Sequence, residues 1–371
     1  MNTAELQEYI TKGAERIVSE AVRATLRDPK EAAFMARFAV SSAKAAERRK
    51  LHEQEGLHVP TFLIASITSA CNLHCAGCYS RAENATQDCA PVRQLTAEDW
   101  DRVFVEAEAL GIGFILLAGG EPLLRRSVVE KAAARSGILF PVFTNGTYLD
   151  EKYFDLFDRK RNLVPVVSIE GGREKTDKRR GEGVYDTLRS NMEEFSRRGI
   201  LWGASVTVTK ENLAEVSSPS FAEELTALGC RLFILVEYVP VTEESRDLAP
   251  EEEDRERLRE AAESLRTGFP GAIFLTFPGD EKASDGCLAA GRGFFHINSH
   301  GGAEPCPFSP YSDVNVKETS LRAAMESGLF ERIRDGGLLL EEHVGGCTLF
   351  ERRSEVEAIA LSPADLKPQG A

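Results

Sequence analysis

The sequence has no uninterrupted apolar run of about eighteen residues, the length that a membrane-spanning helix needs. Its first ten residues, MNTAELQEYI, contain neither a basic segment nor an apolar core, so they do not form a secretory signal. Basic residues are also in the minority, because 45 Lys and Arg stand against 59 Asp and Glu, a formal net charge of −14. This acidity argues against nucleic acid or an anionic membrane as the main partner. We therefore expect a cytoplasmic protein with neither kind of contact.

The composition is otherwise that of a globular protein, with 371 residues of which 42% are hydrophobic. Eight cysteines are present. Thiols stay reduced in the cytoplasm, so this number suggests metal binding or catalysis before it suggests disulfides. The positions of the cysteines therefore decide the interpretation.

The N-terminal region, residues 1–58, is predicted to be a helical extension. Apolar residues recur at three- and four-residue spacing over 3–27 and 30–51, and Asp28-Pro29 separates the two segments. We interpret this pair as a helical cap that packs on the main domain.

Residues 59–270 alternate between β-rich apolar runs and polar, helix-patterned segments. Short apolar runs without strict alternation are typical of strands buried on both faces of a parallel sheet. The predicted strands are 62–68, 114–120, 139–146, 163–171, 202–209 and 231–239, and the predicted helices are 96–110, 125–136, 150–160, 184–199, 214–228 and 250–266. Six such units predict an α/β fold, a partial (β/α)6 TIM-like barrel. In such barrels the chemistry lies at the carboxyl ends of the strands.

After about residue 270 this alternation stops. The segment GFFHINSHGGAEPCPF, at 293–308, has the pattern of a hairpin with SHGG as its turn, and a helix is expected near 319–334. Residues 271–360 are therefore predicted to form a small C-terminal domain, and 361–371 a frayed tail.

Three cysteines, Cys71, Cys75 and Cys78, follow the first predicted strand as C-x3-C-x2-C. Three thiolates in one loop suit a soft metal centre. Closed zinc sites normally take four ligands, and no fourth residue completes a familiar zinc spacing. On a four-iron cluster, three cysteines leave one iron without a protein ligand, where a small chelating molecule can bind.

With these cysteines and the short motifs that follow them, the sequence resembles the radical S-adenosylmethionine (radical SAM) superfamily. GGEP resembles the family motif that meets the methionine amino group, while TNG and SIEG stand where the family contacts SAM. The residues implied in SAM binding are Gly119, Gly120, Glu121, Pro122, Thr144, Asn145, Ser168 and Glu170. Many members carry an aromatic residue just before the third cysteine, near the adenine; here that residue is Gly77, and Tyr79 is a candidate to take its place.

The resemblance also implies a mechanism. The open iron of a 4Fe-4S cluster binds SAM, and an electron from a reducing partner such as flavodoxin or ferredoxin cleaves SAM to methionine and a 5′-deoxyadenosyl radical. That radical takes a hydrogen atom from the substrate. The protein holds the substrate and excludes water and oxygen.

A second group of cysteines lies in the C-terminal region. Cys287 and Cys306 form C-x13-G-x4-C across the predicted hairpin, and Cys347 follows later. This pattern resembles the SPASM/Twitch extensions, which hold auxiliary iron–sulfur clusters, and the shorter Twitch form fits better because residues 307–346 contain no cysteine. An auxiliary cluster, expected to be 4Fe-4S, then has three visible ligands; Cys89 is either the fourth ligand or an unpaired loop thiol, unless an open iron binds substrate directly.

Two alternatives stand beside this assignment. The second cysteine group can instead be a zinc knuckle or unrelated buried thiols, and Cys230, which begins a strand, is interpreted as a buried small apolar residue. The whole chain can instead be a non-enzymatic iron–sulfur or zinc protein with a redox or regulatory function. Such a protein does not need GGEP, TNG and SIEG at the strand ends.

Within the enzymatic reading, the substrate is either a peptide or protein side chain or a small molecule that is oxidised. Glu237 and Tyr238 end the sixth strand, and we expect them at the barrel mouth as acid/base candidates.

Overall fold

The computed structural model describes residues 3–25, 28–89, 93–277, 284–340 and 347–361. The predicted tail at 361–371 therefore lies outside the described residues except for Leu361. Among the described residues, no helix is both long and apolar enough to cross a membrane.

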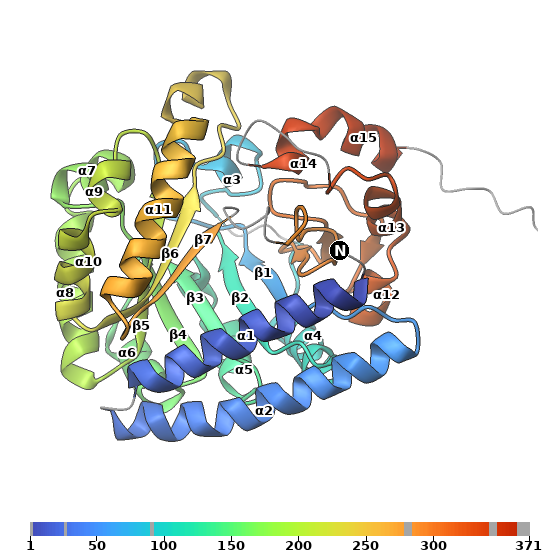
Figure 1. Cartoon of the computed structure of the whole chain (residues 1–371), viewed down its shortest axis with the longest axis horizontal. Coiled ribbons are helices and arrows are strands. Elements are labelled where there is room, and N and C mark those ends of the chain that lie inside the picture. The colour runs from blue at the N-terminus through green and yellow to red at the C-terminus, as the bar shows by residue number, and fades with distance from the viewer. Residues whose placement is uncertain (1–2, 26–27, 90–92, 278–283, 341–346, 362–371) are drawn as a thin grey trace, which may run out of the picture.

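One ten-stranded sheet runs through the molecule in the order β10-β9-β8-β1-β2-β3-β4-β5-β6-β7 (Figure 1). The strands are β1 (Phe62–Thr68), β2 (Phe114–Gly119), β3 (Phe140–Thr144), β4 (Leu163–Ser168), β5 (Trp202–Val208), β6 (Cys230–Glu237), β7 (Ile273–Phe277), β8 (His296–Ile297), β9 (Gly302–Glu304) and β10 (Val314–Asn315). Strands β1 to β7 pair in parallel, which confirms the predicted α/β partial barrel. The part formed by β1 to β7 has one strand more than the six predicted, because the run at 273–277 pairs with β6.

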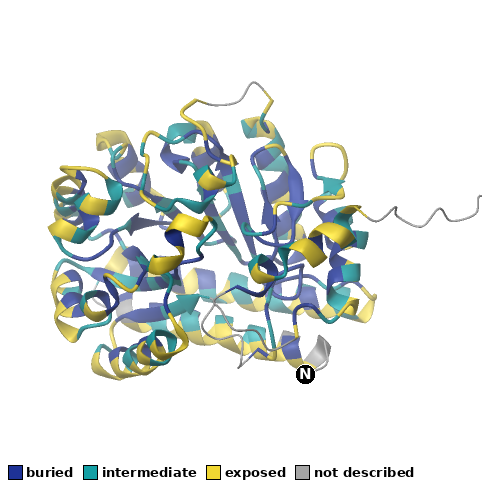
Figure 2. Ribbon diagram, turned by 90° about the horizontal axis from the view of Figure 1, so that it is seen from above, coloured by how far each residue is buried: buried dark blue, intermediate teal, exposed yellow. Residues whose placement is uncertain are grey.

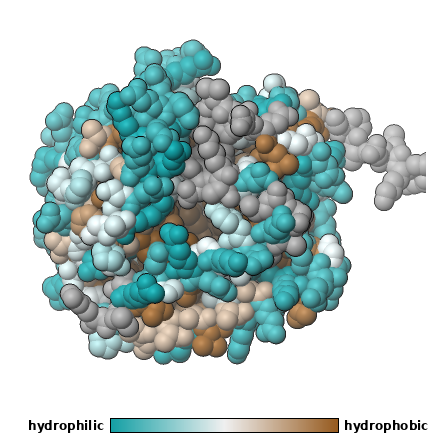
Figure 3. Space-filling view, in the orientation of Figure 1, coloured by the Kyte–Doolittle hydropathy of each residue, from teal (hydrophilic) through white to brown (hydrophobic). Residues whose placement is uncertain are grey.

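Helices lie around this sheet (Figure 1). They are α3 (Tyr79–Ala82), α4 (Ala97–Leu110), η1 (Pro122–Arg125), α5 (Arg126–Ala133), α6 (Glu151–Arg159), α7 (Arg173–Arg180), α8 (Val184–Arg198), α9 (Leu213–Val216), α10 (Pro219–Ala227), η2 (Glu243–Leu248), α11 (Glu252–Gly268), α12 (Leu321–Met325), α13 (Gly328–Asp335), α14 (Thr348–Glu351) and α15 (Arg353–Leu361). Figure 2 shows the buried strands at the centre and exposed residues on the surrounding helices. The outer face of α11 is hydrophilic, as its charged sequence predicts (Figure 3).

The N-terminal extension consists of α1 (Thr3–Thr25) and α2 (Pro29–Gln54). Asp28 caps α2 by accepting hydrogen bonds from two backbone N–H groups of the first turn, and Pro29 begins the helix, so the predicted break is observed. The two helices run side by side across the lower ends of the strands (Figure 1). Phe38 packs edge-on against Phe114, with 5.6 Å between ring centroids. The extension therefore packs on the sheet as a cap.

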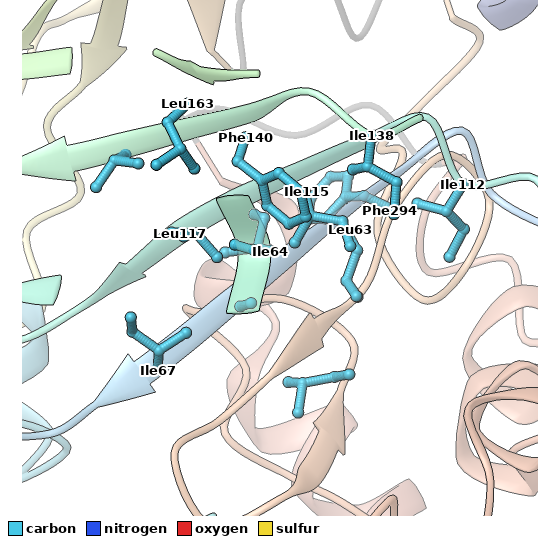
Figure 4. Close-up of a cluster of buried hydrophobic side chains, with 14 of the residues drawn as sticks. Leu63, Ile64, Ile67, Ile112, Ile115, Leu117, Ile138, Phe140, Leu163 and Phe294 are labelled. Atoms are coloured by element: carbon cyan, nitrogen blue, oxygen red, sulfur yellow. The ribbon is translucent and has the colours of Figure 1, made fainter. Parts of the chain in front are cut away.

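The main core lies between the sheet and its helices. Leu63, Ile115, Leu117 and Phe140 come from three adjacent strands and are fully buried (Figure 4). Burying a side chain of this size contributes about 1.5–3 kcal/mol. This packing holds the strands in register, so their carboxyl ends meet at one edge.

Two predicted helices are divided in the structure. The segment at 319–334 forms α12 and α13, because the Ser327 hydroxyl caps a new helix by accepting from the Phe330 N–H at 3.1 Å. The segment at 214–228 forms α9 and α10, with Ser218 as the cap and Pro219 as the first residue of the second helix.

The predicted hairpin is present as the antiparallel strands β8 and β9. Its first strand also pairs in parallel with β1, with Ile64 opposite His296 and Ala65 opposite Ile297. The C-terminal region therefore extends the barrel sheet at the β1 edge.

Candidate active site

The first cysteine group occupies the loop between β1 and α3. Cys71, Cys75 and Cys78 are half-buried free thiols. The Cys71 N–H donates to the Gln87 carbonyl at 2.9 Å, and the Cys78 N–H donates to the Cys75 carbonyl at 3.2 Å. Burial raises the pKa of the Cys71 thiol. A positively charged partner such as an iron ion would favour the thiolate at this position.

Arginine side chains hold this loop from both sides. Arg81 donates to the Cys71 carbonyl at 3.0 Å and to the Leu73 carbonyl at 2.9 Å. On the other side, the Ala76 N–H donates to the Arg179 carbonyl at 2.8 Å, and Arg179 Nε donates back to the Ala76 carbonyl at 3.1 Å. The loop conformation is thus fixed by contacts to α3 and to the end of α7.

Helix α7 was not predicted, yet it brings a second arginine to the loop. Arg180 Nη1 lies 3.9 Å from Cys75 Sγ, while its Nε and Nη2 donate to Glu170 at 3.0 and 2.5 Å. Burial lowers the pKa of Arg180, but Glu170, Cys75 and Cys78 together outweigh it, and the net shift is upward. A permanently charged guanidinium beside a cysteine sulfur suits an anionic cluster and an anionic ligand. The sequence REKTDKRR has no apolar stripe, so only its basic character after SIEG signalled these residues.

Glu170 itself is buried within these contacts. Besides Arg180, its carboxylate accepts from Arg179 at 3.2 Å and from the Thr207 N–H at 3.1 Å. Glu170 is predicted to contact SAM; in the structure its carboxylate accepts from both arginines. Ser168, at the end of the same strand, is half-buried opposite Ser205.

The GGEP segment passes very close to the end of β1. A Cβ on Gly119 would lie 2.2 Å from the Thr68 carbonyl oxygen, and one on Gly120 would lie 2.1 Å from that of Ala70. The glycines are therefore required for contact with the chain's own backbone. Pro122, which is buried, begins η1.

Glu121 is 1% exposed and ties the ends of β2 and β3 together. Its carboxylate accepts from the Thr144 hydroxyl at 2.8 Å, the Asn145 N–H at 2.8 Å and the Leu123 N–H at 3.0 Å. Burial raises the pKa of Glu121 to about 7. Asn145 continues toward the loop, where its Nδ2 donates to Asn72 Oδ1 at 3.0 Å and lies 3.9 Å from Cys71 Sγ.

The two acid/base candidates after β6 lie in different surroundings. Glu237 is 5% exposed and forms an ion pair with Arg255 of α11. Tyr238 is 4% exposed and turns toward the cysteine loop, against Gly77. Of the two, Tyr238 is thus the one placed at the cluster loop.

Tyr79 stands on the other side of the loop. Its ring packs on Phe308, with 4.6 Å between centroids, and burial raises the pKa of its hydroxyl. It therefore faces the C-terminal region, and Tyr238 is the aromatic residue against Gly77.

A cavity of about 190 Å³ lies beside Tyr79, between the end of β1, helix α3 and the β8–β9 hairpin. Its lining includes the polar residues Ser66, Thr68, Tyr79, His296, Asn298 and Glu304. His296 Nε2 is 2.7 Å from Ser66 Oγ, and His296 Nδ1 is 2.7 Å from Glu304 Oε2. This Ser66–His296–Glu304 relay joins the barrel to the hairpin. Sequence reasoning missed it because its first two members are separated by 230 positions.

The second cysteine group is buried at three places in the C-terminal region. Cys287 lies before β8, Cys306 follows β9, and Cys347 precedes α14. Cys89, the candidate fourth ligand, is exposed. Cys230 is fully buried, and burial raises its pKa to about 12, which confirms its structural interpretation.

The described residues contain no group of three or more His, Cys, Asp or Glu side chains arranged to hold a single metal ion. In a four-iron cluster each thiolate binds a different iron, so the sulfurs need not converge on one point. The half-buried thiols and the adjacent Arg180 and Asn145 donors therefore fit such a cluster in the first loop.

Residues 65–218, which contain this loop and all the strand ends described above, match the family model described as "Radical SAM superfamily". The chain contains a radical SAM domain over these residues. It is an enzyme, and the cofactors of this superfamily are a 4Fe-4S cluster and SAM. The resemblance read from the sequence is thereby confirmed.

Several known proteins are similar to this radical SAM enzyme. The "AdoMet-dependent heme synthase" of Methanosarcina barkeri is 26% identical over 321 residues, 79% of this chain and 89% of that protein. The "PqqA peptide cyclase" of Rhizobium meliloti is 26% identical over 296 residues, 74% of this chain and 76% of that protein. The crystal structure of Streptococcus suis SuiB superposes with a TM-score of 0.65 at 18% identity, covering 79% of this chain and 71% of that one, which supports the fold.

Proposed function

We propose that this enzyme modifies a peptide or protein side chain, whose reacting group enters the cavity between the cysteine loop and the β8–β9 hairpin. The observation that carries the proposal is the position of this cavity: it is bounded on one side by Tyr79, next to Cys78, and on the other by Glu304, two residues before Cys306. When bound, the cluster and SAM supply a 5′-deoxyadenosyl radical that removes a hydrogen atom from the substrate.

Residues around the cysteine loop are assigned to binding the cluster and SAM. Cys71, Cys75 and Cys78 hold the cluster, Arg180 presents its guanidinium to anionic groups beside Cys75, and Asn145 donates toward Cys71. The backbone carbonyls of GGEP remain the candidates for the methionine amino group, since the Glu121 carboxylate is occupied by three internal donors.

The Ser66–His296–Glu304 relay is suited to accept a proton. With Glu304 accepting from His296 Nδ1, His296 Nε2 accepts from the Ser66 hydroxyl, and Ser66 Oγ can take a proton from an O–H, N–H or S–H group in the cavity. A two-electron oxidation removes this proton, one hydrogen atom and one electron from the substrate. We assign the electron to an auxiliary cluster held by Cys287, Cys306 and Cys347, with Cys89 as the candidate fourth ligand.

A cavity of about 190 Å³ accommodates a side chain rather than a whole large molecule, and relatives such as PqqA peptide cyclase are named for peptide substrates. A second candidate, small-molecule oxidation, is favoured by the similarity to a heme synthase along 89% of its length. A cytoplasmic location and a flavodoxin or ferredoxin as reductant fit either substrate.

The first test is SAM cleavage by the anaerobically reconstituted enzyme. We expect 5′-deoxyadenosine after addition of SAM and dithionite, about eight irons per chain for two four-iron clusters, and loss of cleavage in Cys78→Ala. Cys230→Ala, which removes a buried structural thiol, is the matched control and should retain cleavage. Failure of the wild-type enzyme to form 5′-deoxyadenosine with an intact cluster would refute the proposal.

The second test separates the substrate classes. Cells that produce the protein are grown in deuterated medium, and their extract is divided into peptide and small-molecule fractions. Only the fraction that contains the substrate transfers deuterium into 5′-deoxyadenosine. Deuterium from the small-molecule fraction alone would replace the peptide proposal with the second candidate.

A further inference from the structure

Tyr238 carries a buried hydroxyl group that has no hydrogen-bond partner within the described part of the chain. The backbone N–H of Tyr238 donates to the Val208 carbonyl at 2.9 Å, which continues the pairing of β5 and β6 by one residue. The side chain is therefore held rigidly at the carboxyl end of the sheet, with the residue 4% exposed. A buried hydroxyl without a partner costs about 1–3 kcal/mol, so its retention calls for an explanation.

The hydroxyl is directed at the cysteine loop. A Cβ on Gly77 would lie 2.4 Å from Tyr238 Oη and 3.0 Å from Cζ, so the phenol occupies the space that any side chain at position 77 would need. Gly77 lies between Cys75 and Cys78 and has a φ of +66°, a conformation that favours glycine. The two residues are thus complementary: Gly77 has no side chain, and the Tyr238 phenol fills the space beside its backbone.

The charged neighbour of Tyr238 does not complete its hydrogen bonding. The Arg179 guanidinium carbon lies 5.8 Å from the centre of the Tyr238 ring, and Arg179 Nε is already bonded to the Ala76 carbonyl. Arginine is a donor only and cannot accept the phenolic proton. The missing partner must therefore be an acceptor.

We propose that Tyr238 donates this hydrogen bond to an acceptor bound inside the cysteine loop, either a sulfur of the iron–sulfur cluster or an oxygen of SAM. The inference rests on the proposed function, because it requires both groups to occupy the loop. Tyr238 then acts as a positioning residue for the cofactor and not as an acid or base toward the substrate.

The test compares Tyr238→Phe with the wild-type holoenzyme, and it distinguishes the two acceptors. If the acceptor is SAM, Tyr238→Phe weakens SAM binding about ten-fold, the equivalent of about 1.4 kcal/mol, while the reduction potential of the SAM-free cluster is unchanged. If the acceptor is a cluster sulfur, the reduction potential of the SAM-free cluster is lower in Tyr238→Phe than in the wild type. The reason is that a hydrogen bond to sulfur stabilises the reduced, more negative state of the cluster, and the variant lacks that bond. Affinity is measured by calorimetry and the potential by titration monitored by electron paramagnetic resonance.

Controls separate this inference from the proposed function. Tyr148→Phe changes an exposed tyrosine and should match the wild type in both measurements. Iron content should be equal in all three proteins, because Phe keeps the ring that covers Gly77. If the wild type binds cluster and SAM but Tyr238→Phe leaves both affinity and potential unchanged, the inference is wrong while the proposed function stands. If the wild type binds neither, the proposed function itself fails.

Discussion

Replacing Glu121 by glutamine tests whether a buried carboxyl beneath the cofactor site titrates near neutral pH. Burial raises the pKa of Glu121 to about 7 from its ordinary value of 4.5. At about 1.36 kcal/mol per pH unit, this difference amounts to about 3 kcal/mol. The folded state thus holds its proton up to a higher pH than the unfolded state does.

Stability therefore decreases as the pH rises, because the unfolded state ionises before the folded state. Below about pH 4.5 both states are protonated, and the preference for the protonated folded form is fully present. As the pH rises toward about 7, the unfolded chain ionises first, so the contribution of Glu121 to stability is lost. Between pH 5 and pH 8 we expect the free energy of unfolding of the wild type to fall by about 2.5 kcal/mol relative to Glu121→Gln.

The comparison is made by urea unfolding of both proteins at several pH values, under anaerobic conditions. Other titrating groups cancel in the difference, and Glu130→Gln, on the exposed face of α5, serves as the control and should show no pH-dependent difference. The amide introduced by Glu121→Gln keeps one carbonyl oxygen for the Thr144 or Asn145 donors, so a constant offset is expected at every pH. A difference that stays constant from pH 5 to pH 8 would show that the carboxyl is not desolvated as described.

Two further variants test the rest of the site. Glu170→Ala leaves the buried Arg180 guanidinium without its carboxylate, so we expect a loss of about 3–5 kcal/mol in the free energy of unfolding; Glu174→Ala, on the exposed side of α7, should cost less than about 0.5 kcal/mol. His296→Gln breaks the proton relay, and we expect substrate turnover to fall about 10²–10⁴-fold. SAM affinity should fall much less than turnover. An equal loss of turnover and SAM affinity would show that His296 acts at the cofactor instead.

Much of the fold follows from local sequence. The run at 62–68 has its predicted bounds in the structure, as β1, because β-branched and apolar residues end at a polar loop. The cysteine spacing likewise indicated the cluster loop, since ligands within eight residues need no long-range information. Local sequence did not predict helix α7, because its residues are mostly charged and only Thr176 is buried. The position of this helix is set by the ion pair between Arg180 and Glu170.

Roles at the site were harder to predict than positions. Glu121 and Glu170 are predicted to contact SAM because motif order places them at strand ends, but motif order does not give the direction of a side chain. In the structure each carboxylate is taken by internal donors. Buried carboxylates generally need such partners, so a motif glutamate that is fully buried is more readily explained as an organiser of the residues around it than as a direct ligand.

The pairing of β8 with β1 connects the two cysteine regions more tightly than an appended domain would. Side chains alternate along a strand, so a shift of one residue in this pairing would turn His296 away from Ser66 and break the relay. The same pairing brings β9, and with it Glu304 and then Cys306, next to the barrel. The backbone that sets the proton relay therefore also sets the position of the proposed auxiliary cluster. Because of this shared register, a mutation that shifts the hairpin is expected to impair proton and electron transfer together, whereas one confined to the cysteine loop is expected to impair SAM cleavage, the step on which both transfers depend.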